Sequence, residues 1–200
     1  MQRSGKIARF LYLDLNSAQS YSYPISEKNQ KLYLGGKGLA IKIFYDLLKD
    51  RLENIDPLGD QNLLIIAAGP FLGTKAPCSA RFEVVTKSPL TGLLVGSSCG
   101  GPFGEALRSA GWDGLIISGR AEKMGRLTID GEDAVLEDAE SLKGLETSPC
   151  EEALALGPGD GALLIGPAGE NLVRYANIRS GHRFAGRGGA GAVMGAKGLK

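Results

Sequence analysis

Apolar and polar positions alternate along several short stretches, a pattern that predicts β-strands rather than long helices. Residues 7–15 alternate in this way, and residues 81–86 and 172–178 do so again. A continuous apolar run over residues 63–68 predicts a strand buried on both faces, and it ends at a Gly-Pro pair. The chain should therefore be built around a β-sheet.

Helical periodicity is confined to short segments. It predicts a helix over residues 39–49, with its apolar side chains on one face. Two shorter helices are predicted over residues 105–110 and 148–156, the second with Ser148 as its N-cap and Pro149 in its first turn. Further strands are predicted over residues 21–24, 93–95, 114–118 and 162–165, and a hairpin over residues 126–129 and 134–137.

The order of these elements contains a weak internal repeat. Residues 64–70 resemble residues 163–167, and each segment precedes an alternating strand, a glycine-rich loop and a helix of small residues. The apolar strand that closes the first copy has no counterpart before Lys200, so we hypothesise that the chain is the front part of a longer polypeptide. We expect an α+β fold, with two β-sheets related by an internal pseudo-twofold repeat and short helices.

Two glycine-rich loops carry the candidate chemistry. Glycine accounts for 30 of 200 residues, about twice its usual share, and it concentrates in residues 97–104 and 181–197. In the second loop, Arg183 and Arg187 stand four positions apart, on one face if the segment is helical. Glycine permits close backbone approach and arginine supplies a fork of donors for phosphate, which favours anion binding. The alternative is that both arginines are solvated surface charges. The two loops would face a ligand with two similar halves, or two copies of one ligand.

Overall composition excludes several classes of partner. The net charge of +1 gives no broad basic surface for nucleic acid or an anionic membrane. No apolar run reaches the roughly 18 residues of a membrane span, and the N-terminus lacks the order of a signal peptide. We therefore expect a cytoplasmic protein that binds neither nucleic acid nor membrane.

The remaining motifs are weak. Cys78, Cys99 and Cys150 are too widely spaced for a zinc or iron–sulfur site, so we expect three reduced thiols. Residues 35–38, Gly-Gly-Lys-Gly, lack the spacing of a phosphate-binding P-loop. No paired carboxylates with the character of acid–base machinery are present, so we predict no catalytic residue and no protein metal ligand in this chain.

Six motifs, in order and nearly end to end, resemble the N-terminal domain of the aldehyde ferredoxin oxidoreductase family. They are Leu-Gly-Gly-Lys-Gly-Leu-Ala at residues 34–40, Ala-Ala-Gly-Pro at 67–70, Thr-Lys-Ser-Pro-Leu-Thr-Gly at 86–92, Ala-Gly-Trp-Asp-Gly at 110–114, Ile-Gly-Pro-Ala-Gly-Glu-Asn-Leu at 165–172, and the glycine-rich residues 181–195. The resemblance implies that residues 1–200 form the N-terminal pterin-cofactor-binding domain of a longer enzyme.

The resemblance also implies a cofactor and the residues that bind it. In this family a pair of β-sheets supports a tungsten, sometimes molybdenum, bis-pyranopterin, whose two phosphates are joined through a bridging magnesium ion. Carried over by motif, the first loop and the strand before it would contribute Arg81, Ser98 and Gly100. The second loop would contribute Arg183, Phe184, Gly186 and Arg187.

Two of these positions depart from the family pattern. The family often has asparagine at the position of Ser98 and a small residue at that of Phe184, and both positions help to hold the magnesium ion. The second does so through its backbone carbonyl, which any side chain retains. Serine is shorter than asparagine, so Ser98 would need a water molecule between itself and the ion.

In the complete enzyme, an aldehyde would be oxidised to a carboxylate and the electrons would pass to ferredoxin. The family's [4Fe–4S] cluster is bound by a C-terminal part that this chain lacks, so the segment alone should be inactive. The alternative is a non-catalytic pterin-binding or docking subunit that needs a partner chain for redox chemistry. A third hypothesis is a β-rich interaction domain whose glycines serve only turns. Tungsten and molybdenum both fit, as do a homo-oligomer and a complex with a partner subunit.

Overall fold

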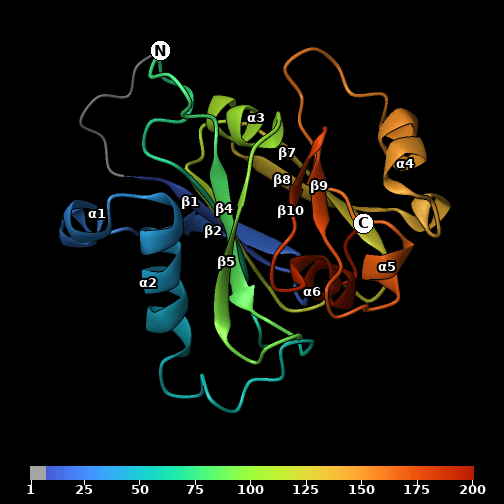
Figure 1. Cartoon of the computed structure of the whole chain (residues 1–200), viewed down its shortest axis with the longest axis horizontal. Coiled ribbons are helices and arrows are strands. Elements are labelled where there is room, and N and C mark those ends of the chain that lie inside the picture. Colours follow the sequence, from blue (N-terminus) through green and yellow to red (C-terminus); the bar gives the residue numbers. More distant parts are fainter. Residues whose placement is uncertain (1–7) are drawn as a thin grey trace.

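A six-stranded mixed sheet is the central layer of the computed structural model, which describes residues 8–200 (Figure 1). Residue 7, where the first predicted strand begins, lies outside the described residues. The strand order is β2-β1-β6-β3-β4-β5, with β1 parallel to β6 and the other neighbours antiparallel. The strands are β1 (Phe10–Asp14), β2 (Gln19–Tyr23), β3 (Leu64–Ala68), β4 (Phe82–Lys87), β5 (Leu94–Cys99) and β6 (Gly114–Ser118).

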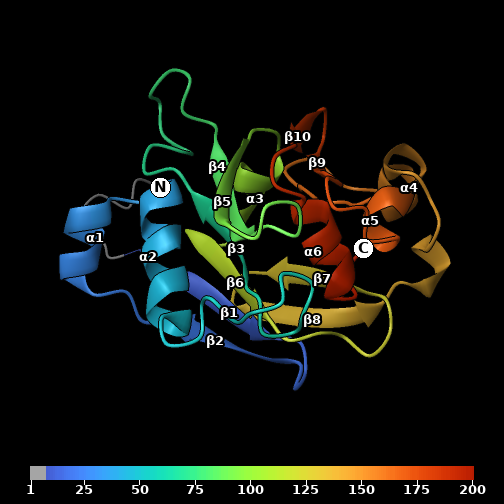
Figure 2. The same ribbon diagram turned by 60° about the horizontal axis from the view of Figure 1, so that its bottom comes forward.

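Both faces of the central strands of this sheet are buried, as the apolar run of β3 predicted. Helix α2 (Gly36–Leu48) covers one face, where Ile65 packs in the same cluster as Phe44. Helix α6 (Ala190–Ala196) and two small sheets cover the other face, where Ile66 packs in the same cluster as Val193 (Figure 2). The sheet thus separates two cores, and alternate residues of each strand contribute to opposite cores.

The outer layer consists of short elements from the second half of the chain. Two hairpins, β7-β8 and β9-β10, form separate two-stranded sheets. No helix among residues 8–200 has both the length and the apolar character needed to cross a membrane. The remaining elements are β7 (Gly125–Asp130), β8 (Asp133–Asp138), β9 (Ile178–Ser180), β10 (Arg183–Ala185), α1 (Glu27–Tyr33), α3 (Phe103–Ser109), α4 (Thr147–Leu154), α5 (Pro167–Glu170) and a 3-10 turn, η1 (Glu140–Leu142).

The strand pairings support the internal repeat. In the first half, β3 pairs antiparallel with β4, which forms a hairpin with β5. In the second half, Leu164 bridges antiparallel to Arg179 of β9, which forms a hairpin with β10. The parallel pair β1-β6 likewise corresponds to the parallel bridge between Gly125 of β7 and Leu199. The fold is α+β with several sheets, and the second half reproduces the pairing order in shorter pieces.

Several element predictions are confirmed, and four need correction. The strand over residues 114–118 and the hairpin around Asp130 and Gly131 are confirmed. Residues 97–99, predicted to lie in a glycine-rich loop, are the last three residues of β5. Residues 172–178 do not form a strand before β9, because the short helix α5 and turns precede it.

The third and fourth corrections concern a strand and a helix cap. Residues 162–165 contribute a single bridge instead of a strand. Ser148 lies inside α4, whose N-cap is Glu146, and its hydroxyl oxygen accepts a hydrogen bond from Arg179. Helix α1 was not predicted. The sequence feature that indicates this helix is its N-cap, Ser26, whose side chain accepts a hydrogen bond from the Asn29 N–H.

Lys197, just after α6, is buried, and no carboxylate among residues 8–200 is hydrogen-bonded to it. Its ammonium donates to the backbone oxygens of Asn62 (2.5 Å) and Gly119 (3.1 Å), which ties the outer layer to the sheet. Burial lowers the pKa of Lys197 to about 7, with Arg120 adding to the effect and Asp60 opposing it. The folded protein therefore releases this proton far below the ordinary lysine pKa.

This burial makes a prediction about stability and pH. Between pH 7 and about 10 the unfolded chain holds a proton on Lys197 that the folded chain has lost, so stability should rise with pH by up to about 1.4 kcal/mol per unit. Urea unfolding of the wild type and Lys197→Met at several pH values measures this. The difference in unfolding free energy between them should widen in favour of the wild type as pH rises. Parallel curves would show that Lys197 stays protonated in the fold.

Candidate cofactor-binding site

The two glycine-rich segments, far apart in the sequence, meet at the end of β5. Gly101 has φ +93°, and a Cβ atom there would lie 2.2 Å from the backbone oxygen of Ser180. A Cβ atom at Gly100 would lie 3.6 Å from Cγ of Arg183. The Ser180 hydroxyl oxygen also accepts a hydrogen bond from the Phe103 N–H at 3.3 Å. Only glycine at position 101 allows the β9-β10 hairpin to approach this closely.

The loop between β10 and α6 lies along the same strand. The Arg187 N–H donates to the hydroxyl oxygen of Ser97 at 3.1 Å. Gly188, with φ +74°, leaves so little space that a Cβ atom would lie 2.5 Å from the Val95 side chain. Residues 183–188 are therefore held against β5 by backbone contacts, with Arg183 in a strand and Arg187 in a loop. They do not share a helical face, because the segment between them is not helical.

Three arginines are exposed where these segments meet. Arg81 precedes β4, Arg183 lies on β10 and Arg187 follows it. Among residues 8–200, none of their guanidinium groups forms an ion pair or a hydrogen bond. Three exposed cations that have no protein partner among residues 8–200 lie next to backbone N–H groups in glycine-rich loops, an arrangement whose chemistry suits an anion such as phosphate.

Cys99 lies near Arg81 and Arg183 and is not available as a ligand. Burial raises the pKa of the Cys99 thiol, while its contact with Gly100 and the charges of Arg81 and Arg183 lower it by less. The thiol is therefore protonated at neutral pH, and it faces the Gly100 backbone oxygen at 3.2 Å. All three cysteines are free, as predicted.

The other predicted residues lie at the border of this site. Phe184 and Gly186 are exposed on β10 and in the loop after it, and Gly100 is half-buried between the two segments. Ser98 is exposed on β5, whereas its neighbour Ser97 is buried. Because strand residues alternate between faces, Ser97 contacts the second loop and Ser98 points to the face that carries α2. Sequence reasoning missed Ser97, although strand alternation beyond residue 95 would have indicated it.

Arg179 is a fourth arginine near the site, but its role is structural. Its guanidinium forms an ion pair with Glu151 at 2.7 Å and donates to the side-chain oxygens of Thr147 and Ser148. Its Nε donates to the Gly181 oxygen in the turn of the β9-β10 hairpin. Arg179 thereby fixes the hairpin that presents Arg183.

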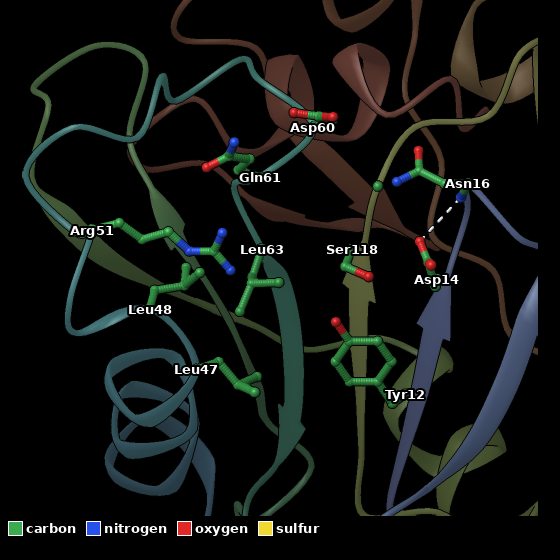
Figure 3. Close-up of a pocket in the computed structure, with 11 residues that line it drawn as sticks. Tyr12, Asp14, Asn16, Leu47, Leu48, Arg51, Asp60, Gln61, Leu63 and Ser118 are labelled. Carbon is green, nitrogen blue, oxygen red and sulfur yellow. Dashed lines mark hydrogen bonds between the residues drawn. The ribbon is translucent and has the colours of Figure 1, made fainter.

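A separate hollow of about 240 Å³ lies between the ends of β1, β3 and β6 and the end of α2. The Arg51 and Tyr12 side chains extend into it from opposite sides (Figure 3). None of the seven predicted cofactor residues lines it. The loop site and this hollow are thus distinct places on the molecule.

Comparison with known proteins identifies the family. Residues 10–200 match the family model described as "Aldehyde ferredoxin oxidoreductase, N-terminal domain". The chain belongs to this family. It is 44% identical over 200 residues, 98% of its length, to the "Tungsten-containing aldehyde ferredoxin oxidoreductase" of Pyrococcus furiosus, and equally identical to that of Thermococcus kodakarensis. It spans about a third of the length of these relatives, 33% in both cases.

Two further relatives of this aldehyde ferredoxin oxidoreductase N-terminal domain are described as parts of assemblies. One is the "Aliphatic sulfonate oxidoreductase, WOR-like subunit" of Pyrococcus furiosus, 35% identical over 96% of the chain and 33% of that protein. The other is a solved structure, "Active site complex BamBC of Benzoyl Coenzyme A reductase in complex with 1,5 Dienoyl-CoA". It superposes with a TM-score of 0.91 and 37% identity, over 96% of this chain and 30% of that one. The fold is therefore shared by relatives that are named for different activities.

The close approach at Gly101 gives a prediction with a matched control. Gly131 also has a positive φ, +57°, but a Cβ atom there meets nothing within 4 Å. Gly131→Ala should cost only the backbone strain of about 1–2 kcal/mol. Gly101→Ala should cost more, because the new methyl group displaces the Ser180 backbone. Urea denaturation compares the two unfolding free energies, and equal losses would mean that the two loops are not tightly apposed.

Proposed function

We propose that this domain holds a tungsten bis-pyranopterin cofactor, through phosphate binding by Arg81, Arg183 and Arg187. The observation that carries the proposal is the meeting of two glycine-rich segments that expose three arginines, whose guanidinium groups have no partner within residues 8–200. The 44% identity to tungsten-containing aldehyde ferredoxin oxidoreductases supports tungsten over molybdenum. Each glycine-rich segment would receive one half of the cofactor, which accords with the repeated pairing order of the two halves.

The donor set fits such a group. Guanidinium forks bind phosphate oxygens in pairs, and the glycine-rich backbone at Gly100 and Gly186 lets a flat ring system approach closely. Among residues 8–200, no three His, Cys, Asp or Glu side chains lie close enough together to hold a metal ion. The tungsten would therefore be held by the pterin rather than by side chains of this segment, and the bound metal would supply the redox chemistry.

A magnesium ion joining the two cofactor phosphates would lie near Ser98 and the backbone carbonyl of Phe184. Ser98 is exposed on β5, and Phe184 is exposed on β10 with its side chain 53% accessible. Magnesium keeps several of its water molecules when it binds protein. A serine hydroxyl that contacts one of these waters fits this preference, so Ser98 would act through water.

The complete protein would oxidise an aldehyde to a carboxylate and pass the electrons through a [4Fe–4S] cluster to ferredoxin. Support comes from the similarity to tungsten-containing aldehyde ferredoxin oxidoreductases, of whose length this chain spans about a third, 33%. The cluster and the substrate pocket would be formed by residues outside this third. A second candidate is a subunit that contributes the pterin site to a complex. It is favoured by the two relatives described as a subunit and as part of an active-site complex.

Removal of the arginines tests cofactor binding. In the purified complete protein, Arg183→Ala and Arg187→Ala should lower tungsten and pterin per chain several-fold, because each removes a bidentate phosphate contact. Elemental analysis and pterin fluorescence measure this loss. Stability should change little, since neither guanidinium has a protein partner among residues 8–200. Arg51→Ala, in the separate hollow, is the control and should retain the wild-type tungsten content. Full tungsten in both site variants would refute the proposed function.

A further inference from the structure

The face of the sheet next to Ser98 carries an ion pair that the function above does not use. Glu83 on β4 is the register partner of Ser98 on β5, so their side chains share a face with Cβ atoms roughly 4.5–5.5 Å apart. Lys37, in the first turn of α2, extends across β5 at Gly96, two residues before Ser98. Its Nζ lies 3.9 Å from Oε2 of Glu83.

The Glu83 carboxylate is incompletely satisfied. Its Oε2 atom is buried and has no hydrogen-bond partner within residues 8–200. The distance to Lys37 Nζ is too long for a hydrogen bond, and the lysine side chain is 54% exposed against 17% for Glu83. Buried carboxylate oxygens are normally paired, so an orphan of this kind indicates a missing partner, such as an ion or its water.

Glu83 is placed where it can supply the oxygen ligand and negative charge that Ser98 lacks. The hydroxyl of Ser98 offers one neutral oxygen on a short side chain. The carboxylate of Glu83 offers anionic oxygen on the same face, and magnesium prefers carboxylate and water oxygens. Gly96 gives Lys37 its position, because a Cβ atom there would lie 2.7 Å from the Lys37 Cε atom. An exposed, flexible ammonium beside the carboxylate can move away when a divalent cation arrives.

We propose that Glu83 is a further residue of the cofactor site. Its carboxylate holds the water molecules around the bridging magnesium ion, and it thereby compensates for the short side chain of Ser98. The proposal rests on the function proposed above. Lys37 is the monovalent partner of Glu83 when magnesium is absent. Glu83 is a positioning residue for the ion and takes no part in oxidation of a substrate.

The test is the rate at which the complete, cofactor-loaded protein loses magnesium to EDTA, with tungsten and magnesium counted by elemental mass spectrometry. Glu83→Gln should release magnesium roughly 10- to 100-fold faster than the wild type, the usual effect of losing an outer-shell partner. Lys37→Met should release it at the wild-type rate or more slowly, because it removes the competing cation. Glu122→Gln, an exposed acid in the turn between β6 and β7, is the matched control and should equal the wild type.

Three results would overturn the inference. The first is that Glu83→Gln releases magnesium at the wild-type rate and has a raised melting temperature. The carboxylate would then be an unpaired buried charge that only destabilises the fold. If Glu83→Gln and Lys37→Met lose magnesium and tungsten equally, the pair serves to position Lys37, which would then bind a cofactor phosphate itself. If Glu83→Gln does not fold, Glu83→Asp, which keeps the charge one methylene shorter, should still accelerate release, and an unchanged rate would refute the proposal.

The same measurements separate this inference from the function on which it rests. Wild-type protein that contains neither tungsten nor magnesium would refute both. Loss of tungsten in Arg187→Ala, together with unchanged magnesium release in Glu83→Gln, would refute only the role of Glu83.

Discussion

The close backbone contact between the second glycine-rich segment and β5 is the constraint on which the site depends. At Gly101 and Gly188 the space for a Cβ atom is already taken by Ser180 and Val95. At Gly189 a Cβ atom would lie 2.0 Å from the backbone oxygen of Arg174. Side chains at these positions would separate the layers, so glycine is required by the approach itself and by the positive φ angles. Part of the high glycine content thus reflects packing between elements rather than turns alone.

The arginines near this contact differ in whether they have protein partners. Arg179 lies on β9, the strand paired with that of Arg183. Its guanidinium is already bound by Glu151, Thr147 and Ser148, and these contacts anchor the hairpin to α4. Arg183 and Arg187, on the other side of the hairpin turn, extend to solvent without partners among residues 8–200. This difference between the arginines follows from burial. A buried guanidinium must be paired within the protein, whereas an exposed one is solvated and remains available to a ligand. Arg179 therefore supports the site, whereas Arg183 and Arg187 are available to bind a ligand.

Two sides of β5 serve different purposes. Ser97, buried, accepts the hydrogen bond that holds the Arg187 backbone. Ser98, exposed on the opposite face, shares its surroundings with Glu83 and Lys37. A strand at the edge of the sheet can thus contact the second glycine-rich segment with one face and the first turn of α2 with the other. The repeated pairing order places β10 beside this edge, so both halves of the chain contribute to one location.

The amino-acid sequence alone determined the elements with strong local patterns. The buried strand β3, the hairpin at Asp130 and Gly131, the two glycine-rich segments and the family were all predictable from it, because periodicity, turn residues and motifs are local. It did not reveal that residues 97–99 continue β5, or that Ile178 alone of residues 172–178 belongs to a strand. Only the tertiary structure placed Glu83 opposite Ser98. It also showed that Arg179 is paired within the protein and Arg183 is exposed. Strand register and burial depend on contacts between residues far apart in the chain, which no local pattern specifies.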